Sequence, residues 1–311
     1  MNDTAVPERR FPTGTVLQAG GGIYDVLLDD QSRIRATLRG RLKLEQRTGD
    51  RVVAGDRVRI DAHPDGSFTI ESVQPRKTQL ARRAPGRHER HAKVIVANVD
   101  QVVLVFAAAL PEPRRRMIDR LLVLAESNGI PAAIIINKAD LASLTDLEAA
   151  FAAYERAGYP LLFTSVLTGR SIDALRHLLC GRESVLTGPS GAGKSSLLNA
   201  VEPGLELRVG DVSAAVRKGR HTTVTATLVP LACGGFVVDT PGLREVGLWG
   251  IDPEDLDACF PEFRPFLDHC RFGSSCTHTH EPDCAVRTAV ESGGLDGERY
   301  LSYAAMMAGN A

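Results

Sequence analysis

Gly188-Pro-Ser-Gly-Ala-Gly-Lys-Ser195 matches the G-x-x-x-x-G-K-S pattern of a loop that binds nucleotide phosphates. A strand-like stretch, 184–186, precedes it and a helix-like stretch, 196–199, follows it. Its three glycines let the backbone turn and aim N–H groups inward at a helix N-terminus, which forms an anion-binding nest. We expect Lys194 to reach the β- and γ-phosphates and the Ser195 hydroxyl to ligate Mg2+.

A second motif, Asn137-Lys-Ala-Asp140, follows the apolar run 130–136, which predicts a buried parallel strand. Ligands bind at the carboxyl ends of such strands. The Asp140 carboxylate can accept hydrogen bonds from N1–H and the exocyclic amine of guanine, a pairing that adenine cannot offer. The motif thus predicts GTP as the ligand; the alternative is an Asn/Asp turn that closes a strand. Because Asn137-Lys-Ala-Asp140 precedes the phosphate loop along the chain, the order of the motifs indicates a circularly permuted GTPase.

A third motif, Asp239-Thr-Pro-Gly242, ends the predicted strand 235–238. We expect Asp239 to hold Mg2+, directly or through water, and the Gly242 amide to contact the γ-phosphate. Either Thr222 or Thr223 is expected to complete the metal shell, and the sequence does not decide between them.

Leu243 stands where many GTPases carry the glutamine that orients the attacking water, and a leucine cannot perform that role. Hydrolysis is therefore expected to be very slow alone, or to need another polar group when a partner binds. His221 is the candidate for that group; the alternative is a solvated loop histidine.

The composition predicts a globular protein without membrane segments. At 311 residues, 43% of them hydrophobic, the chain can bury cores for two or three domains. No apolar run approaches 18 residues and the amino terminus is polar, so we expect no signal peptide, no membrane span and a cytoplasmic location. There, six cysteines are expected to be metal ligands or core residues rather than disulfides.

The amino-terminal part is basic. Residues 1–98 carry 18 Lys/Arg against 12 Asp/Glu, whereas the remainder carries 19 against 26. Five short strands separated by glycine turns predict a small all-β barrel of the OB type, a fold that commonly binds oligonucleotides. The predicted strands are Thr15 to Ala19, Tyr24 to Leu28, Ile34 to Leu38, Arg57 to Asp61 and Phe68 to Val73.

Basic side chains on this barrel suggest an electrostatic footprint for RNA phosphates. They are Arg33, Arg35, Arg39, Arg41 and Lys43. Since few aromatic residues are available for base stacking, contacts with duplex backbone are expected rather than readout of single strands. The alternative is a barrel with ordinary surface charge.

The rest of the chain predicts a linker and then a doubly wound α/β domain. The expected elements are strands 101–107, 131–136 and 161–164, and helices 113–128, 146–157 and 172–179. A strand is also expected from Thr225 to Leu231. Ser165, after the strand 161–164, is expected to make a backbone contact to guanine. The predicted domains are 1–80 for the barrel, 81–93 for a basic linker, 94–246 for the permuted GTPase and 247–311 for a mainly helical zinc-binding domain.

The carboxyl-terminal part contains four metal-ligand candidates within fifteen residues: Cys270, Cys276, His278 and Cys284. Four such ligands with no open position suit a tetrahedral structural Zn2+ site, and a domain of this size benefits from the metal. His269 and His280 are competing ligands. The other cysteines, Cys180, Cys233 and Cys259, have no partners at ligand spacing, and we expect them to pack as small apolar residues.

Taken together, the motifs resemble the RsgA/YjeQ family, the GTPases that depend on the small ribosomal subunit. The resemblance rests on Asn98-Val-Asp-Gln101, Asn137-Lys-Ala-Asp140, Ser190-Gly-Ala-Gly-Lys-Ser-Ser196, Gly219-Arg-His-Thr-Thr223, Asp239-Thr-Pro-Gly242, Cys276-Thr-His278 and Glu281-Pro-Asp-Cys-Ala-Val286. It covers nearly the whole chain. Two features depart from the family: five residues separate Cys270 from Cys276 where four are usual, and the amino-terminal extension is short.

The resemblance implies a late factor in assembly of the small subunit, whose weak GTP hydrolysis the subunit stimulates and whose release follows hydrolysis. It implies contacts of the barrel and the zinc domain with ribosomal RNA, binding of GTP and GDP, and a monomer without a membrane partner. The residues expected at the nucleotide are Asn137, Lys138, Asp140, Ser165, Gly188, Pro189, Ser190, Gly191, Ala192, Gly193, Lys194, Ser195, Ser196, Asp239 and Gly242. Two alternatives are a permuted GTPase of the large subunit and an RNA-binding scaffold without meaningful turnover.

Overall fold

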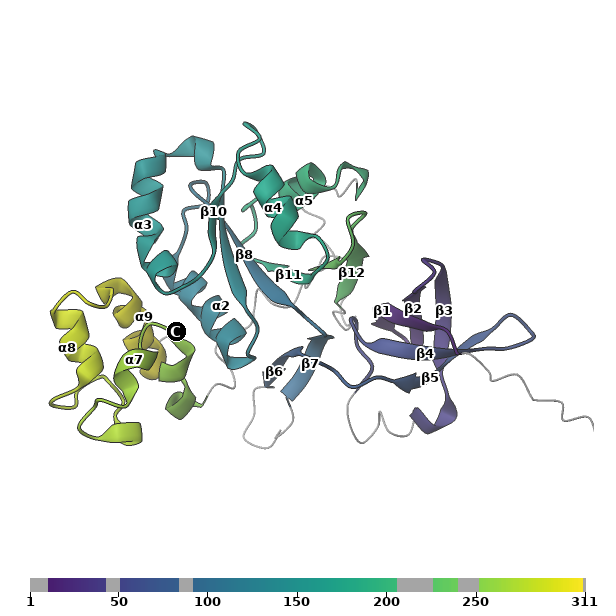
Figure 1. Cartoon of the computed structure of the whole chain (residues 1–311), viewed down its shortest axis with the longest axis horizontal. Helices are drawn as coiled ribbons and strands as arrows, with labels where there is room; N and C mark the ends of the chain where they lie inside the picture. Colours follow the sequence, from purple (N-terminus) through teal and green to yellow (C-terminus); the bar gives the residue numbers. More distant parts are fainter. Residues whose placement is uncertain (1–10, 43–50, 84–91, 206–225, 240–251, 310–311) are drawn as a thin grey trace, which may run out of the picture.

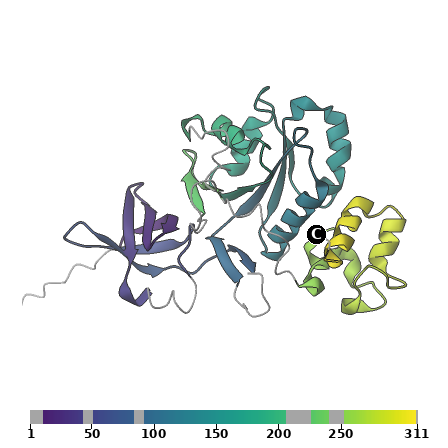
Figure 2. The same cartoon turned by 180° about the vertical axis from the view of Figure 1, so that it is seen from behind.

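The computed structural model describes residues 11–42, 51–83, 92–205, 226–239 and 252–309. These form a small β-barrel, a central α/β domain and a helical carboxyl-terminal lobe, arranged in that order along the molecule (Figure 1). The view from behind shows the same order, with the central domain between the other two (Figure 2).

The amino-terminal barrel has the strand order of an OB fold. Its order is β1-β2-β3-β5-β4, and β1 also pairs with β4, which closes the barrel. β3 and β5 are parallel, whereas the other neighbours are antiparallel. Alternating residues such as Val58 and Ile60 are fully buried in its core. The strands are β1 (Thr13–Gly20), β2 (Ile23–Leu28), β3 (Arg33–Leu38), β4 (Arg57–Ala62) and β5 (Phe68–Val73), so the predicted barrel is confirmed.

The central domain is built on a mostly parallel sheet. Its order is β10-β9-β8-β11-β13-β12, in which β12 alone runs antiparallel to its neighbour. The strands are β8 (Gln101–Ala107), β9 (Ala132–Asn137), β10 (Leu161–Phe163), β11 (Glu183–Thr187), β12 (Thr227–Pro230) and β13 (Phe236–Asp239). The helices are α2 (Arg115–Ser127), α3 (Leu144–Arg156), α4 (Ile172–Leu179) and α5 (Lys194–Val201), with short 3-10 turns η1 (Ala139–Leu141) and η2 (Pro203–Leu205).

Helices cover both faces of this sheet, which explains why its central strands are continuously apolar. Alternate side chains of β8 belong to two different cores: Leu104 and Phe106 pack with residues of α2 and α3, whereas Val103 and Val105 pack with residues of α4 and α5. This confirms the predicted doubly wound domain, with element ends within about two residues of those expected.

The barrel and the central domain are joined by a two-stranded sheet, β6 (Gln79–Arg83) and β7 (Ala92–Ala97), so both ends of the expected linker lie in strands. Asn98 then ties three segments together. Its Nδ2 donates to the Gly55 carbonyl at 2.8 Å, and its Oδ1 accepts from the Lys77 amide at 2.9 Å. A Cβ at Gly55 would lie 2.1 Å from the Ala97 carbonyl oxygen, so only glycine permits this close approach.

Gln101 continues this junction into the central domain. Its Nε2 donates to the Leu178 carbonyl at 2.7 Å and to the Ser184 hydroxyl at 2.8 Å. Asp100 accepts from the Glu183 amide at 2.8 Å. The motif Asn98-Val-Asp-Gln101 therefore anchors the barrel to the strand that leads into the phosphate loop. The two domains also share one sheet, because Gln18 of β1 pairs with Thr227 of β12.

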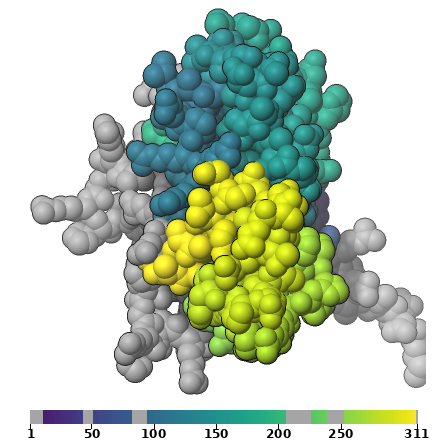
Figure 3. Space-filling model, turned by 90° about the vertical axis from the view of Figure 1, so that its left-hand side faces the viewer, coloured from purple at the N-terminus to yellow at the C-terminus, as the bar shows by residue number. Residues whose placement is uncertain are grey.

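The carboxyl-terminal lobe consists of short helices: η4 (Pro253–Asp255), η5 (Asp257–Cys259), α7 (Arg264–Leu267), η6 (Gly273–Ser275), α8 (Ala285–Glu291) and α9 (Gly297–Met307). It packs against the central domain (Figure 3). Its aromatic core surrounds Phe260, Phe263 and Tyr303, and Val123 of α2 belongs to the same core. The lobe is therefore held on α2 by apolar packing.

A buried arginine adds polar contacts to this interface. Arg299 of α9 is 2% exposed and donates to Asp119 of α2 at 2.7 Å and to Glu262 at 2.7 and 3.0 Å. Its guanidinium lies 4.8 Å from the ring centre of Phe260 and 5.2 Å from that of Tyr154 on α3. Although burial opposes it, the carboxylates of Glu262 and Asp119 raise the pKa of Arg299, so the charge is retained.

One expectation about the cysteines is wrong. Cys180 and Cys233 form a disulfide, with Cα atoms 5.4 Å apart. Cys259 is buried in the carboxyl-terminal core, as expected of a small apolar residue. Among the described residues, no helix is both long and apolar enough to cross a bilayer.

We expect Arg299→Met to lower the free energy of unfolding by about 3–5 kcal/mol, because it leaves the Asp119 and Glu262 carboxylates buried without a cation. Urea unfolding followed by the fluorescence of the lobe's aromatic residues measures the change. Arg271→Met is the matched control, because the Arg271–Asp283 pair is exposed and such pairs contribute about 1 kcal/mol or less. Equal unfolding midpoints for the two variants would contradict the importance of the buried pair.

Candidate nucleotide and metal sites

The phosphate loop connects β11 to α5, as the sequence predicts. Gly188, Gly191 and Gly193 all have positive φ angles. A Cβ on Gly188 would lie 2.0 Å from the Val105 carbonyl oxygen of β8, and one on Gly193 would lie 2.3 Å from Asn137 Nδ2. The loop therefore lies tightly against the ends of β8 and β9, and glycine is required at both positions.

The first two residues of α5 are polar and nearly completely buried. Lys194 and Ser195 are 4% and 5% exposed. Lys194 Nζ donates to the carbonyls of Gly188 and Pro189, both at 2.8 Å, so its ammonium lies over the loop. A buried ammonium group beside a glycine-rich loop at a helix N-terminus forms an electropositive site suited to phosphate oxygens.

Asn137 joins the two predicted motifs directly. Its Nδ2 donates to the Ala192 carbonyl in the phosphate loop at 2.9 Å, and its Oδ1 accepts from the Thr164 hydroxyl at 3.2 Å. Asn137 is 2% exposed and Thr164 is fully buried. This bond links residues 55 positions apart, so the segments that the sequence places in inverted order meet at one edge of the sheet.

The residues expected to read the base lie beside this junction. Ser165 donates from its hydroxyl to the Asp140 carboxylate, and the Ala139 amide donates to the Thr164 carbonyl at 3.0 Å. Lys138 adopts a left-handed conformation, and its ammonium donates to the Leu110 carbonyl in the loop before α2. The strand ends of β9 and β10 thus place Lys138, Asp140 and Ser165 together next to the phosphate loop.

The third motif is described only in part. β13 runs parallel to β11, and Asp239, its last residue, pairs in register with Leu186 just before the loop. The backbone of Asp239 is therefore at the same sheet edge as the phosphate loop. His221, Thr222, Thr223, Gly242 and Leu243 lie outside the described residues, as does Lys43.

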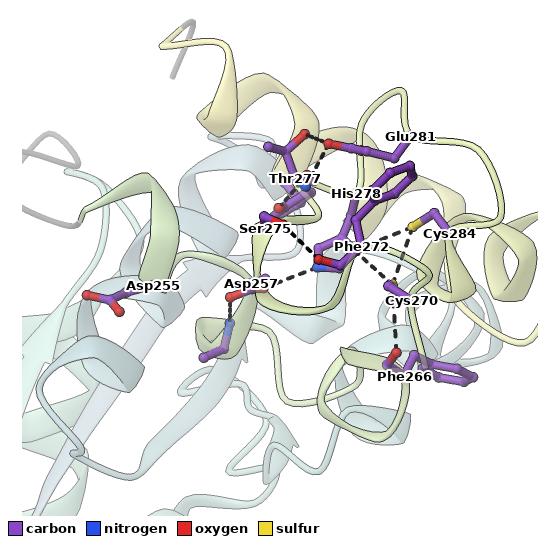
Figure 4. A network of polar contacts seen from close by, with 12 residues as sticks. Asp255, Asp257, Phe266, Cys270, Phe272, Ser275, Thr277, His278, Glu281 and Cys284 are labelled. Carbon is purple, nitrogen blue, oxygen red and sulfur yellow. Dashed lines mark hydrogen bonds and ion pairs between the residues drawn. The ribbon is translucent and has the colours of Figure 1, made fainter. Parts of the chain in front are cut away.

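The carboxyl-terminal lobe brings together Cys270, Cys276, His278 and Cys284, all buried, with their ligand atoms within 4.8 Å of one another. His278 Nδ1 is 3.5 Å from Cys270 Sγ and 3.4 Å from Cys284 Sγ, and the two sulfurs are 3.8 Å apart. Figure 4 shows Cys270, His278 and Cys284 pointing toward one another. The five-residue spacing between Cys270 and Cys276 therefore does not remove Cys270 from the cluster.

These separations fit a tetrahedral cation. Bond lengths of about 2.3 Å to sulfur and 2.05 Å to nitrogen give tetrahedral edges of roughly 3.8 Å between sulfurs and roughly 3.6 Å between nitrogen and sulfur. The separations among Cys270, His278 and Cys284 match both edges, and three thiolates with one imidazole are ligands that Zn2+ prefers.

Neighbouring groups hold the cluster in shape. His278 Nε2 lies 3.1 Å from Asp257 Oδ2, a contact that directs Nδ1 toward the cysteines (Figure 4). The Glu281 carboxylate accepts from the amide and hydroxyl of Thr277 at 2.8 and 2.6 Å. Although burial opposes it, these bonds lower the pKa of Glu281. The sequence did not single out Asp257, which lies 21 residues before His278 and outside any ligand spacing.

Comparison with known proteins agrees with this architecture. The sequence profile described as RsgA GTPase matches residues 73–249. A Gemmatimonas aurantiaca protein named small ribosomal subunit biogenesis GTPase RsgA is 53% identical over 94% of this chain and 95% of its own length. A Moorella thermoacetica protein of the same name is 43% identical over 95% and 96%.

Two solved structures share the complete fold. The crystal structure of YjeQ from Thermotoga maritima is 37% identical, with a TM-score of 0.78 over 96% of this chain and 98% of that one. YloQ, described as a circularly permuted GTPase, is 30% identical, with a TM-score of 0.75 over 98% and 97%. The profile match, the relatives and the order of the motifs lead to one conclusion: this chain belongs to the RsgA GTPase family.

Proposed function

We propose that this protein hydrolyses GTP to GDP and phosphate and acts in biogenesis of the small ribosomal subunit. The observation that carries the nucleotide assignment is the hydrogen bond from Asn137 to Ala192, which brings the guanine-reading motif onto the phosphate loop. The ribosomal assignment is supported by relatives named for small-subunit biogenesis at 53% and 43% identity.

In the proposed complex, the phosphates lie on the amides of the loop from Gly188 to Ser196, and Lys194 turns from its carbonyl partners to the β- and γ-phosphates. The Asp140 carboxylate pairs with N1–H and the amine of guanine, while Ser165 holds that carboxylate in place and contributes its backbone to the base. Lys138 and Asn137 support the purine from the side of β9. Adenine would leave the Asp140 carboxylate unpaired, which disfavours ATP.

The Mg2+ that accompanies GTP would supply positive charge to neutralise the charge that develops during phosphoryl transfer. We propose that the Ser195 hydroxyl, at the start of α5, would hold this ion together with Asp239, whose backbone ends β13 at the same edge of the sheet. We assign the remaining protein ligand to Thr222 or Thr223, and contact with the γ-phosphate to the Gly242 amide. Because Leu243 cannot orient water, His221 is proposed to do so once the subunit is bound.

RNA is the proposed partner of the barrel. Arg33 and Arg35 are exposed at alternate positions of β3. A cavity of about 840 Å3 is lined in part by four other arginines, Arg39, Arg41, Arg51 and Arg76. Within it, Arg39 pairs with Glu71 and Arg76 with Asp56, so these arginines are held in fixed directions. Arginines fixed around a hollow suit phosphate groups of structured RNA.

We further propose that the barrel and the metal lobe contact ribosomal RNA, that hydrolysis releases the protein, and that it acts as a cytoplasmic monomer. The proposed boundaries are 1–80, 81–93, 94–246 and 247–311. The cation in the lobe is proposed to be a single structural Zn2+, since the four ligands leave no open position.

The hydrolysis test compares GTP turnover with and without purified small subunits, using large subunits and ATP as controls. Small subunits are expected to accelerate GTP turnover, and ATP turnover should stay at background.

Lys194→Ala should lower stimulated turnover about 100-fold or more, since it removes a cation that stabilises the transferring phosphoryl group. Lys138→Ala should raise KM for GTP with a smaller effect on kcat.

The outcomes separate the alternatives. Stimulation by large subunits alone would indicate a large-subunit factor. Unchanged turnover at saturating small subunit, with nucleotide still controlling binding, would indicate an RNA-binding scaffold. Turnover retained by the Lys194→Ala variant would place the phosphate site elsewhere.

His221→Ala is expected to lower stimulated turnover about 100-fold with little change in GTP affinity, because a water-orienting group acts on the chemical step. Single-turnover hydrolysis on the subunit and fluorescence titration with a labelled GTP analogue measure the two quantities. His177→Ala, an exposed histidine on α4, is the control. An unaltered stimulated rate would remove His221 from the mechanism.

The metal test measures zinc content after purification without added metal. The unaltered chain is expected to carry about one zinc ion, and Cys284→Ser to lose it and unfold the carboxyl-terminal lobe at lower temperature. Asp257→Asn should keep the ion but weaken its affinity about 10- to 100-fold, since it removes the contact that orients His278. Cys259→Ser is the control, because that thiol is buried outside the ligand set. Equal zinc in the Cys284→Ser and control variants would refute the assignment.

A further inference from the structure

Cys180 and Cys233 meet at the edge of the central sheet opposite the nucleotide. Cys180 ends α4, three residues before β11, and Cys233 lies in the turn between β12 and β13. The backbone holds these two segments together independently of the sulfurs. The Gly181 amide donates to the Gly234 carbonyl at 2.8 Å, and the Phe236 amide donates to the Arg182 carbonyl at 2.9 Å.

The close approach is also sterically enforced. A Cβ on Gly235 would lie 2.4 Å from the Arg182 amide nitrogen, so glycine lets the turn lie directly on the backbone after Cys180. The two Cα atoms are 5.4 Å apart, within the range that a disulfide spans. Reduction therefore leaves the two thiols adjacent, ready to pair again.

Solvent access separates this pair from the other cysteines. Cys233 is exposed and Cys180 is half-buried, whereas Cys259, Cys270, Cys276 and Cys284 are all buried. Exposed disulfides are the labile ones, and accessible thiols are the ones that exchange with small molecules. Oxidation can thus reach this pair without involving the metal cluster.

We propose that Cys180 and Cys233 are a reversible redox modification site whose oxidant is a low-molecular-weight disulfide such as oxidised glutathione. The exposed Cys233 thiolate attacks one sulfur of that disulfide, forming a mixed disulfide and releasing the first thiol. The Cys180 thiolate then attacks Cys233 Sγ, forming the internal bond and releasing the second thiol. The protein loses two electrons and two protons, and the small disulfide becomes two thiols. A reducing environment reverses both steps.

Oxidation covalently ties the start of β11 to the start of β13. The bridge joins residues 53 positions apart, and the closed loop contains the whole phosphate loop. β11 leads into that loop and β13 leads to Asp239, while β12 of the same hairpin pairs with the barrel. The oxidised form therefore resists separation of these strands, whereas chemistry at the opposite strand ends is unaffected.

The test equilibrates the zinc-loaded full chain in glutathione buffers of increasing oxidised fraction and then alkylates it with a polyethylene-glycol maleimide. We expect two fewer accessible thiols in oxidised buffer, their return on reduction, and a cross-linked peptide containing both residues. The oxidised form should melt roughly 5 °C or more above the reduced form, and its basal GTP turnover should be unchanged. A Cys180→Ser, Cys233→Ser double variant should show neither change, whereas Cys259→Ser should behave as the unaltered chain.

Other outcomes overturn the proposal. One is that the Cys180 and Cys233 thiols stay fully reactive toward the maleimide in oxidised glutathione while the protein retains its zinc. Another is glutathione attached to Cys233 with Cys180 still free, because it shows that the pair does not close. A third is the same rise in melting temperature in the double variant, which places the effect elsewhere.

Discussion

The nucleotide-site geometry depends on one hydrogen bond, which the side-chain amide of Asn137 donates to the backbone carbonyl of Ala192. It fixes the end of β9 to the phosphate loop across the intervening strand β8, and the glycine at 193 is needed because any side chain there would collide with the same amide. The chain order of the two motifs does not matter to this contact, because a parallel sheet requires only that the strands be neighbours in space. Circular permutation therefore leaves the site geometry intact while changing which segment comes after the last strand of the sheet.

The carboxyl-terminal lobe occupies that position in the chain. β13 is the last described strand of the sheet along the chain, and the next described segment, from 252, belongs to the lobe that packs on α2. Arg299, paired with Asp119 of α2 and stacked among three aromatic rings, makes this contact specific in direction. The loop between β8 and α2 also accepts a hydrogen bond at the Leu110 carbonyl from the Lys138 ammonium. Helix α2 thus packs against the lobe, and the loop that leads into this helix contacts Lys138 at the end of β9.

Much of this architecture could be predicted from the sequence, because motif chemistry and periodicity are local. The apolar run 130–136 indicates a buried strand, and the glycines of the phosphate loop indicate a tight turn. The helix predicted over 172–179 has the same bounds in the structure. Contacts between distant segments that carry no recognisable motif were not predictable. Nothing distinguishes Arg299 from a solvated arginine on a helix, nor Asp257 from an ordinary loop acid. The Cys180–Cys233 pair depends on a backbone approach that no spacing rule reveals, and the reducing conditions expected in a cytoplasm favour free thiols instead.

The pairing of Gln18 with Thr227 has a consequence for behaviour in concentrated solution. β12 is the outermost strand of the parallel sheet, and an open rim of amides and carbonyls is a template on which another polypeptide can add itself. Here β1 of the barrel pairs with that edge. Because the barrel is closed by the pairing of β1 with β4, it adds no new unpaired edge strand. The barrel thereby also protects the edge of the central sheet against aggregation.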